Sequence, residues 1–151
     1  MPTGEDMNER PRVGIGVAIR KNGQILIGHR KGDHAGGEWS FPGGHLEYAE
    51  DPVACALRET AEECGVTIGT PWLGMVTNNI FSNGRHYITL IMIADWVAGT
   101  PQVLEPDKMI DWQWCAWTAL PVPLMVPIVS LQKNSFDPTL AQQQDRGLLA
   151  V

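Results

Sequence analysis

Apolar and polar residues alternate or cluster along the chain in patterns that predict several β-strands. Residues 12–20 and 24–29 are rich in aliphatic and β-branched side chains, and Asn22-Gly23 between them is typical of a hairpin turn. Residues 85–97 form a long apolar run, whereas residues 110–117 alternate apolar and polar positions. We therefore expect an early hairpin, one long buried strand and one half-buried strand.

Two segments show a helical pattern instead. Residues 52–63 repeat apolar side chains at helical spacing, with Asp51 at the expected N-cap and Gly65 at the expected end. Residues 124–133 predict a short second helix. Because strands precede and follow the first helix, we expect an α/β fold with a mixed β-sheet packed between helices. The positions of the first helix expected to face the core are Val53, Ala56, Leu57, Ala61 and Cys64.

Length, charge and cysteine usage narrow the class of protein. A chain of 151 residues predicts one domain, which we expect at residues 12–138, between a flexible leader (1–11) and a C-terminal tail (139–151). The net charge of -6 argues against binding to a nucleic acid polymer, and no apolar run approaches the length of a membrane helix. The three cysteines lack CxxC spacing, so we expect small buried thiols in a reducing, cytoplasmic compartment.

Three carboxylates crowd the polar side of the first predicted helix. Glu59 and Glu63 are four residues apart and Glu62 is three residues after Glu59, so all three project from one side. Like charges at this spacing destabilise a helix by about 0.2–0.5 kcal/mol per pair. A divalent cation such as Mg²⁺, which prefers oxygen ligands, would remove that repulsion. The alternative interpretation is a solvated acidic face.

These carboxylates belong to a longer pattern of fixed spacing that resembles the Nudix box. Only Thr60 departs from it, since a bulky apolar residue is usual there. The resemblance implies an α/β/α sandwich and a metal-dependent hydrolase acting on nucleotides. The residues that match the box are Gly44, Glu50, Arg58, Glu59, Glu62, Glu63, Gly65 and Val66.

The Nudix resemblance also implies a metal site. A carbonyl of the Gly43-Gly44 turn and the carboxylates of Glu59, Glu62 and Glu63 are implied to hold Mg²⁺ or Mn²⁺. Glu59 and Glu63 are the pair we expect to contribute first. This ligand set would place the ion against the phosphates of a substrate.

The resemblance implies further roles in catalysis. Arg58 is implied to orient the catalytic carboxylate by an ion pair, with Glu50 as its second partner; a surface bridge to Glu62 is the alternative. The general base is expected to be a box glutamate or a residue of a later loop. Glu105 occupies a loop where related enzymes often carry another metal-site carboxylate, and an ordinary loop glutamate is an equally good interpretation.

A wider similarity covers most of residues 12–138 and points to one branch of the family. Residues 16–50, 85–92, 104–121 and 134–138 resemble the MutT-type nucleoside triphosphate diphosphatases, the branch that includes the eukaryotic thiopurine-nucleotide diphosphatase. The resemblance implies cleavage of nucleoside triphosphates to the monophosphate and pyrophosphate by a homodimer. Two alternatives remain open: a hydrolase of ADP-ribose or a nucleotide sugar, and a nucleotide-binding sensor without turnover.

Substrate contacts follow from the same alignment. Ser40 occupies the position of a glutamine near the base, Phe41 that of a leucine, and Thr89 that of a pocket threonine. Because a changed polar contact alters base discrimination, the thiopurine preference is not carried over. Gly44 and His45 are candidates for contact with a phosphate or the base. A core position for Phe41 and a surface position for His45 are the alternatives.

Overall fold

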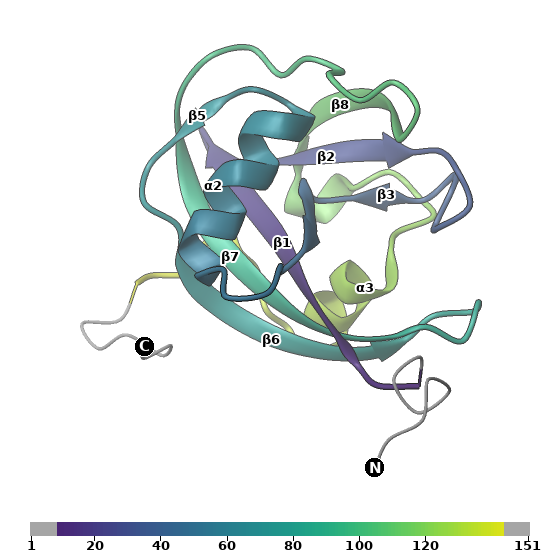
Figure 1. Ribbon diagram of the computed structural model, residues 1–151. Helices are drawn as coiled ribbons and strands as arrows, with labels where there is room; N and C mark the ends of the chain where they lie inside the picture. The colour runs from purple at the N-terminus through teal and green to yellow at the C-terminus, as the bar shows by residue number, and fades with distance from the viewer. Residues whose placement is uncertain (1–8, 144–151) are drawn as a thin grey trace.

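One mixed sheet organises the described part of the chain, residues 9–143 of a computed structural model (Figure 1). Residues 1–8 of the expected leader and residues 144–151 of the expected tail lie outside the described residues. The strands are β1 (Arg12–Lys21), β2 (Gln24–Arg30), β3 (Trp39–Ser40), β4 (Gly43–His45), β5 (Thr67–Ile68), β6 (Trp72–Ile80), β7 (His86–Ala98) and β8 (Met109–Ala116). The helices are α2 (Pro52–Glu63) and α3 (Val126–Lys133), with a 3₁₀ turn, η1 (Trp117–Ala119), before α3.

Strand β1 connects the two halves of the sheet. It pairs in parallel with β7 along most of its length, with Ile15 opposite Leu90. On its other side it pairs antiparallel first with β4 and then, at its carboxyl end, with β2. Strand β2 also pairs with β3 and β8, while β7 also pairs with β5 and β6. The predicted mixed sheet is confirmed.

The two helices cover opposite faces of the sheet, as an α/β/α sandwich requires. Cys55, Ala56 and Cys64 from the α2 region pack into one buried apolar cluster with β1 residues such as Val17. Ile128 and Leu131 of α3 belong to a second cluster, with Ala18 of β1. Neighbouring residues of β1 point to opposite faces, so this strand contributes to both cores. The predicted fold class is therefore confirmed.

The ends of α2 follow the sequence pattern. The Asp51 carboxylate accepts a hydrogen bond of 2.7 Å from the Val53 amide, and Pro52 begins the helix. Gly65, with φ of +75°, follows the C-cap residue Cys64 and ends the helix. These capping interactions need only local sequence, which is why they were predictable.

The buried side of α2 differs from the prediction at two positions. Leu57 is 43% exposed and Ala61 is also exposed, whereas Glu59, Thr60 and Glu63 are buried. The Thr60 hydroxyl donates to the Ala56 carbonyl at 2.8 Å, which satisfies it inside the core. The helix is thus rotated toward β4, so that part of its acidic side faces protein.

The predicted Gly43-Gly44 turn is wrong: both glycines belong to strand β4. Gly43 lies opposite Gly16 and Gly44 opposite Ile15 in an antiparallel ladder with β1. A Gly-Gly pair is typical of turns, but here a long-range partner strand decides its conformation. A side chain at Gly43 would overlap the Ile15 carbonyl, which gives the glycine a steric rather than a turning role.

Two of the three cysteines are buried, as expected. Cys55 and Cys64 are buried free thiols, and Cys115 is a half-buried free thiol. Burial raises the pKa of Cys64 to about 11, so this thiol is unreactive at neutral pH. Within residues 9–143, none of the helices is long and apolar enough to cross a membrane.

Candidate active site

Strand β4 and helix α2 bring two buried glutamates against the glycines. The Gly43 amide donates a hydrogen bond of 3.3 Å to the Glu63 carboxylate. A side chain at Gly44 would overlap the carboxylate of Glu59, so glycine is what allows this group to approach the strand. The Glu59 and Glu63 residues are only 9% and 5% exposed. The carboxylate pair therefore lies at a protein-lined edge of β4, partly removed from solvent.

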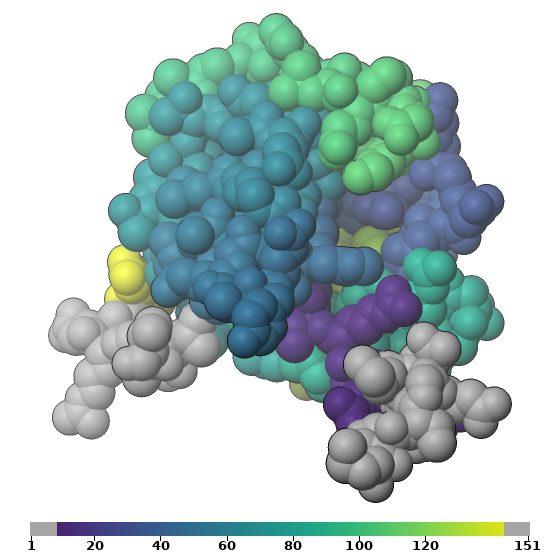
Figure 2. All heavy atoms as spheres, in the orientation of Figure 1, coloured from purple at the N-terminus to yellow at the C-terminus, as the bar shows by residue number. Residues whose placement is uncertain are grey.

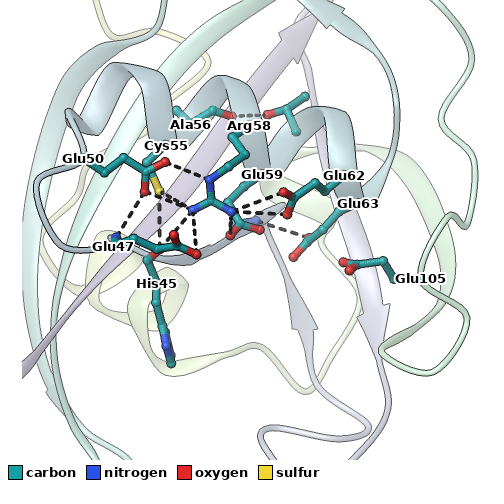
Figure 3. Close-up of polar contacts among 12 residues, drawn as sticks. His45, Glu47, Glu50, Cys55, Ala56, Arg58, Glu59, Glu62, Glu63 and Glu105 are labelled. Atoms are coloured by element: carbon teal, nitrogen blue, oxygen red, sulfur yellow. Dashed lines mark hydrogen bonds and ion pairs between the residues drawn. The ribbon is translucent and has the colours of Figure 1, made fainter.

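Arg58 connects the remaining glutamates (Figure 3). Its Nε and Nη2 donate to the two oxygens of Glu50 at 2.8 and 3.0 Å, a bidentate pair. Its Nη1 donates to Glu59 at 3.0 Å and to Glu62 at 3.2 Å. Arg58 therefore bonds to Glu50 and Glu59, as predicted, and also forms the alternative surface bridge to Glu62. Glu62, whose side chain is 49% exposed, lies toward the solvent side of Arg58.

Burial and charge set the protonation of this cluster. Hydrogen bonds from Arg58 lower the pKa of Glu50 to about 2, so Glu50 stays charged. Burial, reinforced by the charge of Glu59, raises the pKa of Glu63 to about 8. Burial also raises the pKa of Glu59, against the lowering effect of Arg58. Glu105 adds a negative charge that acts on both Glu59 and Glu63.

The chemistry of these donors fits a divalent cation. Ionising both buried carboxylates together is unfavourable, and a nearby positive charge would reduce the repulsion between them. Their oxygen atoms are ligands that Mg²⁺ and Mn²⁺ prefer. Among residues 9–143, no three His, Cys, Asp or Glu side chains converge as a complete metal-ligand group. The Glu105 carboxylate points toward Glu63 in Figure 3, and it also forms an ion pair of 3.5 Å with Lys108. Glu59 and Glu63 are therefore the nearest to a ligand pair, with Glu105 beside them.

A pocket opens on the other side of β4. It holds about 630 Å³ of empty space, its open mouth included. In Figure 2 this hollow lies between β1, the loop that joins β2 to β3, and the β6–β7 hairpin. The five residues predicted to bind substrate all line it: Ser40, Phe41, Gly44, His45 and Thr89.

Further pocket residues come from β7, the β2–β3 loop, the β6–β7 hairpin and the start of α3. Tyr87 stands two residues before Thr89 on the same face of β7, so the period of a strand could have identified it. Its hydroxyl lies 2.8 Å from Nε2 of His45. His34 and Phe81 also line the pocket, but their loops carry no such periodic signal. Met125 and Pro127 at the start of α3 form the far wall.

The neighbouring residues Ser40 and Phe41 line the pocket in different ways. The Ser40 hydroxyl is buried and has no hydrogen-bond partner within the described part of the chain. Phe41 is 6% exposed and packs in the α3-side core while its edge lines the pocket. Phe41 is therefore both a core residue and a pocket residue, which were the two alternatives for it.

Removing the Arg58 guanidinium should lower activity without unfolding the protein. Arg58→Ala breaks the bidentate bond to Glu50 and the bond that orients Glu59. Loss of such an orienting partner typically costs about 10–100-fold, so we expect kcat to fall by about that factor. Arg58→Lys, which cannot form the bidentate pair, should fall in between. Steady-state kinetics with Lys133→Ala as control would check this, and an unchanged kcat in Arg58→Ala would contradict it.

Comparison with known proteins places the chain in a family. A family model described as the NUDIX domain matches residues 10–133. An 8-oxo-dGTP diphosphatase of Proteus vulgaris is 31% identical over 85 residues, which span 56% of this chain and 76% of that protein. An RNA pyrophosphohydrolase of Roseobacter denitrificans is 42% identical over 57 residues, but the match spans only 38% of this chain and 34% of that protein.

A solved structure extends the similarity to three dimensions. The MutT NUDIX hydrolase from Burkholderia pseudomallei matches with a TM-score of 0.77 and 34% identity, covering 82% of this chain and 97% of that one. The chain therefore belongs to the Nudix family, and within it to the MutT-type hydrolases that act on pyrophosphate bonds.

Proposed function

We propose that this enzyme hydrolyses nucleoside triphosphates to the monophosphate and pyrophosphate with Mg²⁺ or Mn²⁺. The observation that carries the proposal is the position of β4. Its glycines line the pocket and also contact the carboxylates of Glu59 and Glu63. A substrate with its base in the pocket would therefore direct its phosphates toward the acidic cluster. The similarity to an 8-oxo-dGTP diphosphatase supports a nucleotide with a polyphosphate chain.

The roles we propose follow from the contacts. Glu59 and Glu63, with Glu62 and the Gly43 carbonyl as further oxygen donors, would hold the metal ion. When bound, such an ion neutralises phosphate charge and lowers the pKa of an attacking water. Arg58 acts as a positioning residue, because it holds Glu59 by a bond of 3.0 Å and is itself held by Glu50.

Glu105 and Glu62 are the candidates for the general base in this proposal. The Glu105 side chain is 27% exposed and borders the buried pair, so it can exchange protons with solvent near the metal ligands. Glu62 is more exposed and is engaged with Arg58. We therefore place Glu105 first. Glu105→Gln should lower kcat while leaving KM for the nucleotide within about twofold.

Substrate contacts complete the proposal. Ser40, Phe41 and Thr89 would surround the base, while Gly44 and His45 would lie between the base and the phosphates. Hydroxyl groups can both donate and accept hydrogen bonds, so Ser40 and Thr89 can adapt to different base edges. The expected homodimer and the cytoplasmic location stay predictions, the first from the family resemblance and the second from the free thiols. Light scattering of the purified protein tests the first.

Product analysis tests the proposed reaction. The protein is incubated with Mg²⁺ and a panel of natural, oxidised and methylated nucleoside triphosphates, and pyrophosphate and nucleoside monophosphate are quantified. ADP-ribose and a nucleotide sugar form a second arm. Monophosphate and pyrophosphate in equal amounts, lost on addition of EDTA, are expected. Turnover of the second arm alone, giving two monophosphates, would instead support the alternative hydrolase, and binding without turnover would support a sensor.

A further inference from the structure

His34 lies where two loops meet across the pocket mouth. It comes from the loop between β2 and β3 and lines the pocket. Its ring centroid is 4.9 Å from that of Phe81 and 5.7 Å from that of Tyr87, which belong to the β6–β7 hairpin region. The imidazole therefore packs against these two aromatic rings. One face of the ring is therefore already occupied by protein.

The loop that carries His34 has a defined shape. Gly32 and Gly37 have φ of +103° and +85°, a region that glycine adopts without strain. The Arg30 amide donates to the Glu38 carbonyl at 2.9 Å, and the Gly37 amide donates to the Arg30 carbonyl at 2.8 Å, so the loop closes on itself. His34 is thus held at the apex of a closed loop rather than at the end of an extended one.

Hydrogen bonds determine which ring nitrogen is the donor. Asn83 Oδ1 accepts a bond of 3.0 Å from the Arg85 amide, which fixes the orientation of the Asn83 side chain. Asn83 Nδ2 then faces Nδ1 of His34 at 3.3 Å. Since Nδ2 can only donate, Nδ1 must accept, and in a neutral ring the proton resides on Nε2. Nε2 has no hydrogen-bond partner in the described part of the chain.

The ring is neutral in this environment. Burial, with the positive charges of Arg30, Arg85 and Arg12, lowers the pKa of His34 to about 4. At neutral pH the side chain therefore presents a single N–H donor at the pocket wall and does not act as a cation. A neutral donor beside aromatic rings suits a flat heteroaromatic ligand with carbonyl or ring-nitrogen acceptors.

We propose that His34 donates a hydrogen bond from Nε2 to the nucleobase of the substrate and so helps to determine base specificity. The identity of the ligand rests on the proposed function, but the contact itself can be tested without catalysis. The Asn83 contact has a positioning role, because it sets which nitrogen carries the proton. The Phe81 and Tyr87 contacts hold the ring in place.

Replacement by phenylalanine isolates the hydrogen bond, since His34→Phe keeps an aromatic ring but has no donor. We measure the Kd for nucleoside monophosphates by calorimetry in EDTA, and KM and kcat for the triphosphates with Mg²⁺. Loss of a neutral hydrogen bond should raise both Kd and KM by about fivefold, while kcat should stay within about twofold of the wild type. The Kd for ribose 5-phosphate, which has no base, should not change. His34→Asn is a second variant in which the same loss is expected if the phenylalanine variant does not fold.

His86→Phe is the matched control, because His86 is the same residue type outside the pocket and bonds to Asn78. It should bind and turn over nucleotides like the wild type. Unchanged nucleotide binding in His34→Phe, an equal loss for ribose 5-phosphate, or the same loss in His86→Phe would overturn the proposal. So would a wild-type protein that binds no nucleotide. If the wild type binds monophosphates through His34 yet hydrolyses no triphosphate, the proposed function fails while the His34 contact stands.

Discussion

Glu63→Gln should abolish hydrolysis and, at the same time, make the metal-free protein more stable at alkaline pH. Glutamine keeps the shape of the protonated side chain but cannot ligate a metal as a carboxylate, so we expect kcat to fall by at least about 10³-fold. Glu63 is buried beside Glu59, and its negative charge is unfavourable in the absence of a cation. The same replacement therefore removes a proposed metal ligand and a destabilising charge.

The direction of the pH dependence follows from the raised pKa. Glu63 titrates near 4.5 when unfolded and at about 8 in the folded protein. Below pH 4.5 the group is neutral in both states and does not lower the free energy of unfolding. As pH rises from 4.5 to 8, the unfolded state loses its proton first, so the wild-type protein loses stability relative to the variant. Above pH 8 the difference should approach an upper limit of about 5 kcal/mol, since a shift from 4.5 to about 8 is about 3.5 pKa units and each unit corresponds to about 1.36 kcal/mol.

Urea unfolding in EDTA at pH 5 and pH 9 measures this difference, with Mg²⁺-dependent pyrophosphate release measured in parallel. Glu9→Gln, which changes an exposed glutamate, is the control and should alter neither property. Normal turnover in the Glu63→Gln variant would show that Glu63 is not a ligand of the metal. A variant with unchanged stability at pH 9 would show that the buried charge is compensated by protein groups.

Gly44→Ala should give a folded protein with very low activity. The added methyl group would overlap the carboxylate of Glu59, which is the end of a flexible side chain and can move aside. Displacing it removes Glu59 from β4 and from the bond to Arg58, so kcat should fall by about 10²–10³-fold. Because only a flexible side chain must shift, the free energy of unfolding should change by less than about 1 kcal/mol.

The adjacent glycine should respond in the opposite way. A methyl group at Gly43 would overlap the Ile15 carbonyl, which belongs to the backbone of the central strand and cannot move aside. Gly43→Ala should therefore destabilise the protein by about 2–4 kcal/mol. Gly69→Ala, whose new methyl would have its nearest contact at 3.8 Å, is the control for both. Thermal unfolding and kinetics of the three variants check the contrast; a Gly44→Ala variant with full activity would disprove the role assigned to this close approach.

Much of the fold was predictable because its signals are local. The caps of α2 at Asp51 and Gly65 and the hairpin at Asn22-Gly23 depend on residues within a few positions of one another. The same holds for the alternation that marks β8. The pocket was predictable only through the family resemblance, which pointed to Ser40 and Thr89 on separate strands. No periodicity of the chain indicates that these two residues face one cavity.

Other features depended on packing between distant segments. The Gly-Gly pair was expected to turn, but pairing with β1 makes it a strand, because ladder hydrogen bonds outweigh a weak local preference. Leu57 and Ala61 were expected in the core, yet α2 is rotated so that Glu59 and Glu63 reach β4. The loop that presents His34 is closed by contacts to Glu38 and to the β6–β7 hairpin, which spacing in the sequence does not reveal.

The sequence by itself determined the acidic ridge of α2, since residues three and four apart on a helix must share a side whatever surrounds them. Only the tertiary structure decided what that ridge faces. Burial against β4 raises the pKa of Glu63, Arg58 joins Glu50 to Glu59, and β4 separates the carboxylates from the pocket while touching both. These properties depend on desolvation and on distances across the sheet, and both are set by which strands pair.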